Sequence, residues 1–128
     1  MKGTIEREWG KYLGSNEWDL YLTFHYYNGC KVNRNRQVME GIYKRNQNVI
    51  ERMFFVSERS SNYYDVHSHV LIKTSSISEV LTNINPLNSL CNISKEGVNN
   101  EIRTDEGVLK VGYYVSKFLE QGVDYDLL

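Results

Sequence analysis

Alternating apolar and polar residues predict three strands in the first 74 positions. Residues 17–26 are rich in aromatic side chains, and Leu20, Leu22 and Phe24 stand at every second position, which is the period of a strand. Residues 53–59 form a second short apolar run. A third strand is predicted over residues 64–74, where Val66, Ser68, Val70 and Ile72 share one face and Asp65, His67, His69 and Leu71 share the other.

Helical spacing of apolar residues predicts the other main elements. Residues 33–52 carry Val38, Ile42 and Val49 near a 3.6-residue period, so we expect a helix with its N-cap near Asn33 or Asn35. A shorter helix is expected from Ser76 or Ser78 to about residue 83, and a last one over residues 107–121, stopped by Gly122. Residues 99–104 are compatible with a strand, whereas residues 88–98 are ambiguous.

The expected order of elements is strand, helix, strand, strand, helix, strand, helix. This order predicts an α+β fold with a mostly antiparallel central sheet flanked by helices. The length of 128 residues fits one domain over 1–128.

Composition narrows the cellular setting more than it narrows the function. No window approaches the run of about 18 apolar residues that a membrane helix needs. Only Cys30 and Cys91 are present, and we expect free thiols in a reducing compartment, hence a cytoplasmic protein. The net charge of −1 does not mark a nucleic-acid binder. Residues 31–52, however, hold six cationic side chains against two acidic ones, which indicates either a phosphate-contacting segment or a solvated helix face.

His67 and His69 are candidates for metal ligands. They lie two apart on a predicted strand, so both side chains point to one face. If residues 53–59 and 64–74 form a hairpin centred at residues 62–63, Glu58 lies directly across from His67, with Cβ atoms about 5 Å apart. Two imidazoles and a carboxylate leave coordination positions open, as a catalytic site requires. The histidine pair alone is also compatible with ordinary surface or core residues.

Two tyrosines near the C-terminus are candidates for a nucleophile. On a helix, Tyr114 and Lys117 are neighbours, and so are Tyr113 and Lys117. A lysine beside a phenol favours its ionised form or holds a phosphate oxygen. Spacing does not choose between the two tyrosines, and both could simply pack at the helix flank.

Three sequence pieces resemble, in their order, the HUH endonuclease domain of rolling-circle replication initiators, the Rep proteins of plasmids and viruses. Residues 21–24 (YLTF) are similar to the first motif, residues 67–69 (HSH) to the metal-binding second motif, and residues 114–117 (YVSK) to the third motif of single-tyrosine members. Glu58 is similar in placement to an acidic third ligand. Ser68 departs from the apolar residue of the family, and its buried hydroxyl would need a backbone carbonyl as a partner.

The resemblance implies a ferredoxin-like sandwich and a DNA-nicking reaction. Glu58, His67 and His69 would bind Mn²⁺ or Mg²⁺, and Tyr114 would attack the scissile phosphate of single-stranded or hairpin DNA to give a 5′-phosphotyrosine and a free 3′-OH. Lys117 would orient the phosphate or the phenolate. DNA-backbone contacts are expected from Arg34, Arg36, Lys44 and Arg45. A homodimer and host replication proteins stay open as partners, and no membrane association is expected.

Three other functions stay open at this stage. A single-tyrosine transposase shares the metal and tyrosine chemistry, although such enzymes often use Gln or Asn as the third ligand and lack the Tyr-x-x-Lys pattern. A non-catalytic DNA-binding replication protein on the same fold would keep the basic helix and tolerate loss of Tyr114. An unrelated metal phosphodiesterase would use water as its nucleophile, so that Tyr114 would be dispensable.

Overall fold

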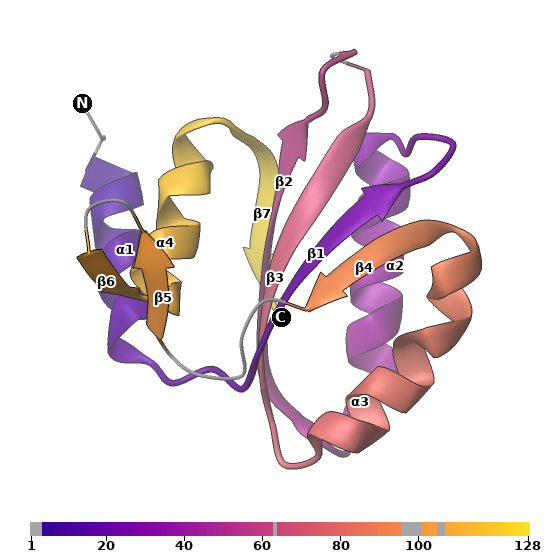
Figure 1. Cartoon of the computed structure of the whole chain (residues 1–128), viewed down its shortest axis with the longest axis horizontal. Coiled ribbons are helices and arrows are strands. Elements are labelled where there is room, and N and C mark those ends of the chain that lie inside the picture. The colour runs from indigo at the N-terminus through magenta and orange to yellow at the C-terminus, as the bar shows by residue number, and fades with distance from the viewer. Residues whose placement is uncertain (1–3, 63, 96–100, 105–106) are drawn as a thin grey trace.

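A five-stranded antiparallel sheet forms the centre of the computed structural model, which describes residues 4–62, 64–95, 101–104 and 107–128 (Figure 1). Its strands follow the order β4-β1-β3-β2-β7, and β5 and β6 pair separately as a small hairpin. The strands are β1 (Leu20–Tyr26), β2 (Ile50–Arg59), β3 (Val66–Thr74), β4 (Cys91–Lys95), β5 (Glu101–Thr104), β6 (Gly107–Lys110) and β7 (Gly122–Leu127).

Helices cover both faces of the sheet, which is seen nearly edge-on in Figure 1. On one side lie α1 and α4, and on the other side lie α2 and α3. The helices are α1 (Thr4–Ser15), α2 (Val32–Arg45), α3 (Ile77–Ile84) and α4 (Val111–Ser116), with short 3₁₀ turns η1 (Asn85–Ser89) and η2 (Lys117–Glu120). Among the described residues, no helix is long and apolar enough to cross a membrane.

The central strand β3 is apolar on both faces because both faces are covered. Val70, Leu71 and Ile72 are all fully buried, although they point alternately to opposite sides. Val70 and Ile72 pack with Met39 of α2, whereas Leu71 packs in a second core beneath α1 and α4. The sheet therefore separates two cores, and the chemistry described below lies on the α1 and α4 side.

The contact between α1 and α4 depends on glycine. A Cβ added at Gly112 would lie 2.0 Å from the backbone oxygen of Leu13, and one added at Gly14 would lie 2.1 Å from the ring of Tyr113. Side chains at these positions would push the helices apart. The close approach fixes where α4 sits above the sheet.

The predicted fold class is confirmed, and so are the three predicted strands within a few residues at each end. The helix expected over residues 33–52 is shorter at its C-terminus, because Asn46 bonds the carbonyl of Ile42 and Ile50 already pairs with β3. The expected N-cap at Asn33 or Asn35 is wrong: the helix begins after Lys31, which makes no side-chain capping hydrogen bond, so both asparagines are helical residues. The side chain of Asn35 is buried. Ser76 caps α3, as expected for one of the two candidate serines.

The helix expected over residues 107–121 is wrong in its first four residues. Residues 107–110 form β6, which pairs with β5, and the hydroxyl of Thr104 donates to the carbonyl of Gly107. The helix begins only at Val111. The sequence analysis also missed α1 and β7. In the ambiguous stretch, residues 91–95 form β4, whereas residues 96–98 lie outside the described part of the chain.

Ser57 and Ser68 are directly opposed on β2 and β3, and both are fully buried on the α2 side. The Ser57 hydroxyl donates to the carbonyl of Asp124 at 3.2 Å. Contrary to expectation, the Ser68 hydroxyl has no hydrogen-bond partner among the described residues. Burying an unpaired hydroxyl costs about 1–3 kcal/mol.

Replacing Ser68→Ala therefore raises the free energy of unfolding by about 1 kcal/mol, because it removes a buried polar group without a partner. The matched change Ser57→Ala lowers it by a similar amount, because a made hydrogen bond is lost. Urea unfolding of the two variants and the wild type measures both. Equal destabilisation by the two changes would contradict the assignment of Ser68 as unpaired.

Candidate metal centre

Three side chains from β2 and β3 converge on the face beneath α4. Glu58 pairs with His67 across the two strands, and His69 lies two residues further along β3. The Nε2 atoms of His67 and His69 each lie 3.1 Å from the same oxygen, Oε1 of Glu58. The three ligand atoms all lie within 4.8 Å of one another, so this cluster could hold a metal ion.

The donor set fits a divalent cation. Two ligands bound at right angles at about 2.1 Å from one ion are about 3 Å apart, and both imidazoles already lie 3.1 Å from the carboxylate. Imidazole and carboxylate together suit Mn²⁺, Fe²⁺ or Zn²⁺ and tolerate Mg²⁺. The cluster is partly open, since His69 is 8% exposed and Glu58 and His67 are intermediate.

Hydroxyl groups lie next to the Nδ1 atoms of both imidazoles, the ring nitrogens that do not face Glu58. The hydroxyls of Tyr21 and Thr23 on β1 each lie 3.4 Å from Nδ1 of His69, and the Ser60 hydroxyl lies 3.5 Å from Nδ1 of His67. A hydroxyl donates or accepts, so these contacts hold whether Nε2 bears a proton or binds a cation. Partners of this kind fix the ring orientation of metal-binding histidines.

Glu58 is charged across the physiological range. Burial by itself disfavours the carboxylate, but hydrogen bonds from His67 and His69 outweigh it and leave the pKa of Glu58 lowered to about 2. An anionic oxygen therefore faces the two imidazoles at neutral pH, which is the state that binds a cation.

Aromatic side chains connect the cluster to α4. Phe118 of η2 stacks on His69, with ring centroids 3.9 Å apart and planes 5° from parallel. Tyr114 contacts Phe118 edge-on at 5.8 Å and lies 6.2 Å from the ring of Tyr21, whose hydroxyl reaches His69. Tyr114 is thus one ring away from a candidate metal ligand.

Tyr113 points elsewhere. Its ring packs over Gly14 of α1, and it is 45% exposed. Of the two tyrosines, only Tyr114 lies next to the cluster. The ammonium of Lys117 lies over the ring of Tyr114, 4.0 Å from its centroid, a cation–π contact that places positive charge beside the phenol.

The structure does not bring the basic residues of α2 to the cluster. They lie on the opposite side of the sheet, and Arg36 is engaged with β7: its guanidinium donates twice to Asp124 and once to Asp126, at 2.7–3.0 Å. These bonds hold α2 against the edge of the sheet, and a phosphate contact by Arg36 would have to break them. Lys44 is exposed near the end of α2.

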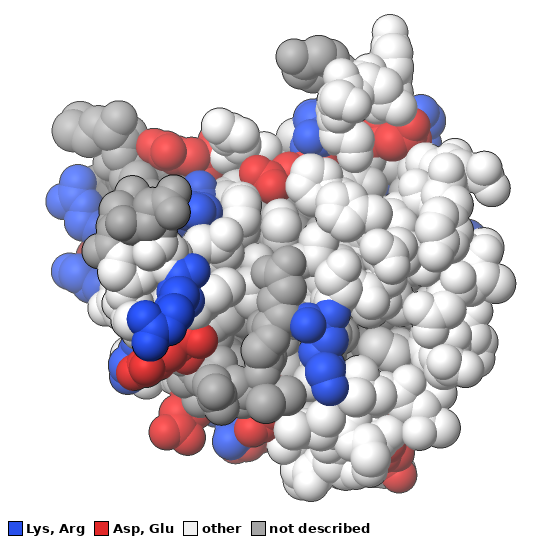
Figure 2. Space-filling view, in the orientation of Figure 1, with Lys and Arg blue, Asp and Glu red and all other residues white. Residues whose placement is uncertain are grey.

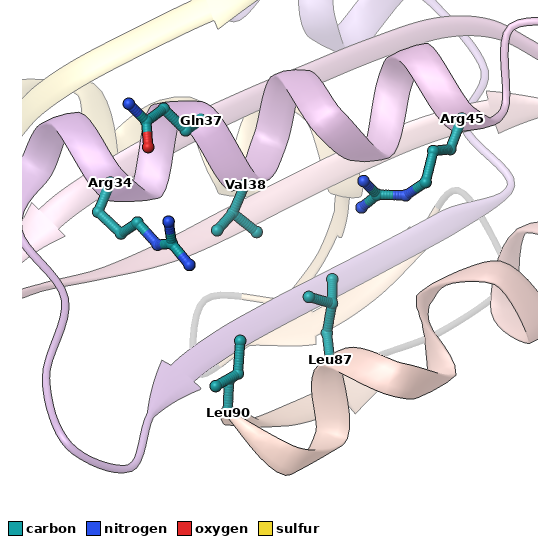
Figure 3. A pocket seen from close by; sticks show the side chains of 6 residues that line it. All are labelled: Arg34, Gln37, Val38, Arg45, Leu87 and Leu90. Carbon is teal, nitrogen blue, oxygen red and sulfur yellow. The ribbon is translucent and has the colours of Figure 1, made fainter.

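Arg34 and Arg45 line a cavity of about 190 Å³ between α2 and the turn after α3. Figure 3 shows both side chains extending from α2 at this cavity, with Leu87 and Leu90 across it. On the face shown in Figure 2, Lys and Arg are scattered among acidic residues and do not gather into one patch. DNA-backbone contacts by Arg34, Lys44 and Arg45 stay a prediction.

The sequence analysis did not identify five contributors to the site: Tyr21, Thr23, His25, Ser60 and Phe118. Thr23 pairs with His69 across β1 and β3, so the strand pairing would have revealed it, had the order of strands been known. Phe118 lies four residues after Tyr114, on the same helical face. His25 stacks on His67, with centroids 5.1 Å apart and planes 13° from parallel, and only the two-residue spacing from Thr23 hinted at it.

Comparisons with protein-family models, with curated protein sequences and with solved structures find no match to this chain.

A divalent cation is expected to stabilise the protein. At a concentration one hundred times its dissociation constant, a ligand of the native state contributes about 2.7 kcal/mol, which raises the melting temperature by several degrees. Melting curves with Mn²⁺, Mg²⁺ and Zn²⁺ measure the effect, and chelation with EDTA should reverse it.

Glu58→Gln keeps the shape of the side chain and removes its charge, so at least tenfold more Mn²⁺ should be needed for the same shift. The matched control is Glu101→Gln, which removes the charge of an exposed glutamate on β5 and should leave the response unchanged. An equal response in all three proteins would exclude the cluster as the binding site.

Proposed function

We propose that this protein is a metal-dependent endonuclease and strand transferase for single-stranded DNA, of the HUH replication-initiator type, with Tyr114 as nucleophile. The observation that supports it most strongly is the placement of Tyr114 against the ring of Phe118, which itself stacks on His69 of the cluster. A tyrosine nucleophile and a cation site on one face are what such a reaction needs.

Glu58, His67 and His69 would hold Mn²⁺ or Mg²⁺. When bound, the ion polarises the scissile phosphate and offsets the negative charge that develops on it. The chain's own hydroxyls keep the two imidazoles in position: Tyr21 and Thr23 hold His69, and Ser60 holds His67.

Tyr114 would form the new bond. Its phenolic oxygen attacks phosphorus, the bond from phosphorus to the 3′-oxygen of the preceding nucleotide breaks, and the proton lost by the phenol is balanced by the one gained by the leaving 3′-oxygen. The products are a 5′-phosphotyrosine and a free 3′-OH. The phosphodiester energy is retained, so a later 3′-OH reverses the step and rejoins the DNA.

Lys117 supports the nucleophile. Its ammonium lies 4.0 Å from the centroid of the Tyr114 ring, close enough to stabilise negative charge on the phenol or on the incoming phosphate. Lys117 is exposed, so an incoming phosphate can reach its ammonium from solvent. As proposed, the substrate is the DNA of a plasmid or virus inside its host cell, exposed as a single strand or a hairpin.

A covalent-adduct assay tests the proposal. The protein is mixed with Mn²⁺ and a labelled pool of single-stranded oligonucleotides, and the products are separated on denaturing gels with and without protease. We expect a protein-linked 5′ fragment with the wild type, its loss with Tyr114→Phe and His69→Ala, and its survival with the matched control Tyr113→Phe.

Other outcomes identify other functions. Cleavage without an adduct, unaffected by Tyr114→Phe, would indicate a phosphodiesterase that uses water. An adduct that disappears with Tyr113→Phe and persists with Tyr114→Phe would contradict the placement of the nucleophile. Binding without any cleavage, including on hairpins taken from a replication origin, would indicate a DNA-binding protein without the proposed activity.

A further inference from the structure

A cavity opens beside the metal cluster on the side away from Tyr114. Its volume is about 360 Å³, within the range of about 300–1,000 Å³ that small-molecule sites occupy. The imidazoles of His25 and His67 form one side, and the other walls come from the end of β1 and the loop that follows it (residues 26–29) and from the hairpin between β2 and β3. His67 therefore belongs to both the cluster and the cavity.

The two loops that wall the cavity are fastened to each other. The backbone N–H of Val66 donates to the carbonyl of Cys30 at 2.8 Å. The carboxylate of Asp65 accepts from Asn62 at 2.7 Å and pairs with Lys31 at 3.3 Å. Gly29 has φ +80°, and a Cβ there would lie 2.5 Å from that carboxylate. These contacts preform the cavity before any ligand arrives.

The lining is aromatic and polar, without a cation. No Lys or Arg is among the described residues that line it, and the carboxylate of Asp65 is already occupied. A phosphate would find no counter-charge there. The stacked imidazoles of His25 and His67, the side chain of Tyr27 (a residue 63% exposed) and Asn28 instead line the cavity with aromatic rings and hydrogen-bonding groups. A nucleobase has matching chemistry.

The order of the aromatic rings between Tyr114 and the cavity indicates whether the base 5′ or the base 3′ to the cut would occupy the cavity. Tyr114 contacts Phe118, Phe118 stacks on His69, His69 meets His67 edge-on at 5.3 Å, and His67 stacks on His25 beside the cavity. In an in-line displacement the attacking and leaving oxygens lie on opposite sides of phosphorus. With Tyr114 at one end of this row, the leaving 3′-oxygen faces the cavity at the other end.

We propose that this cavity binds the base of the nucleotide immediately 5′ to the cut, the one that departs with the free 3′-OH. The inference rests on the proposed function and adds a subsite to it. Tyr27 stacks on that base, and Asn28 contacts its edge. Holding the base keeps the 3′-OH near the phosphotyrosine, where it is ready for the reverse, joining reaction.

A double-mutant cycle between protein and DNA tests the subsite. The cut position is first mapped with the wild type, and the rate of adduct formation is then measured on three substrates: intact, lacking the base 5′ to the cut, and lacking the base 3′ to the cut. Tyr27→Ala is compared with the wild type and with Tyr12→Ala, which truncates a tyrosine of α1 outside the cavity.

Loss of the 5′ base should slow the wild type roughly tenfold, the size of one lost base-stacking contact. The same loss should slow Tyr27→Ala only slightly, because its stacking contact is already absent. Loss of the 3′ base should slow all three proteins by the same factor. Additive effects of Tyr27→Ala and the missing 5′ base on the rate would overturn the inference. Non-additive effects of Tyr27→Ala and the missing 3′ base would instead show that the cavity binds the base 3′ to the cut. If the wild type forms no adduct, both the proposed function and this inference are wrong. If an adduct forms but Tyr27→Ala and the missing 5′ base act independently, only the subsite is wrong.

Discussion

The antiparallel pairing of β2 with β3 is the constraint on which the rest of the site depends. This pairing sets Glu58 opposite His67 and Val56 opposite His69, so one carboxylate oxygen lies equally near two imidazoles. A shift of one residue would turn Glu58 toward the α2 side. The apolar run in the middle of β3, buried on both faces, makes such a shift costly because every core side chain would move to the wrong face.

The layer of α1 and α4 supplies the second half of the site. Close packing at Gly14 and Gly112 sets α4 directly against α1. Tyr114 of α4 then contacts Phe118 of the following turn η2, and Phe118 stacks on His69 of the sheet. Tyr113, one residue earlier, faces α1 instead. The contact between α1 and α4, which involves none of the three candidate metal ligands, thus determines which tyrosine lies beside the cluster. The opposite layer, with Arg36 bound to β7, holds the sheet and does not reach the cluster.

The parts predicted from sequence are those that follow from local periodicity. The two-residue spacing of His67 and His69 places both on one face whatever the fold, and a short hairpin was enough to add Glu58. Long-range pairings were out of reach. β7 pairs with β2 across more than sixty residues of chain, and α1 packs against α4 through Gly14 of α1 and Gly112 of α4, about a hundred residues apart in the sequence. Local periodicity was misleading at Val108. Its spacing from Val111 and Val115 fits the apolar face of a helix, yet the residue lies exposed on β6.

The most direct test of the central claim is to identify the residue that carries the DNA. Trypsin cleaves after Lys110 and Lys117, so it releases residues 111–117 as one peptide, which contains both tyrosines and Ser116. After adduct formation with Mn²⁺ and trimming of the DNA to a single nucleotide, tandem mass spectrometry of this peptide should place the 5′-phosphonucleotide on Tyr114. A nucleotide on Tyr113 or on Ser116, or unmodified peptide from protein that has cleaved its DNA, would contradict the account.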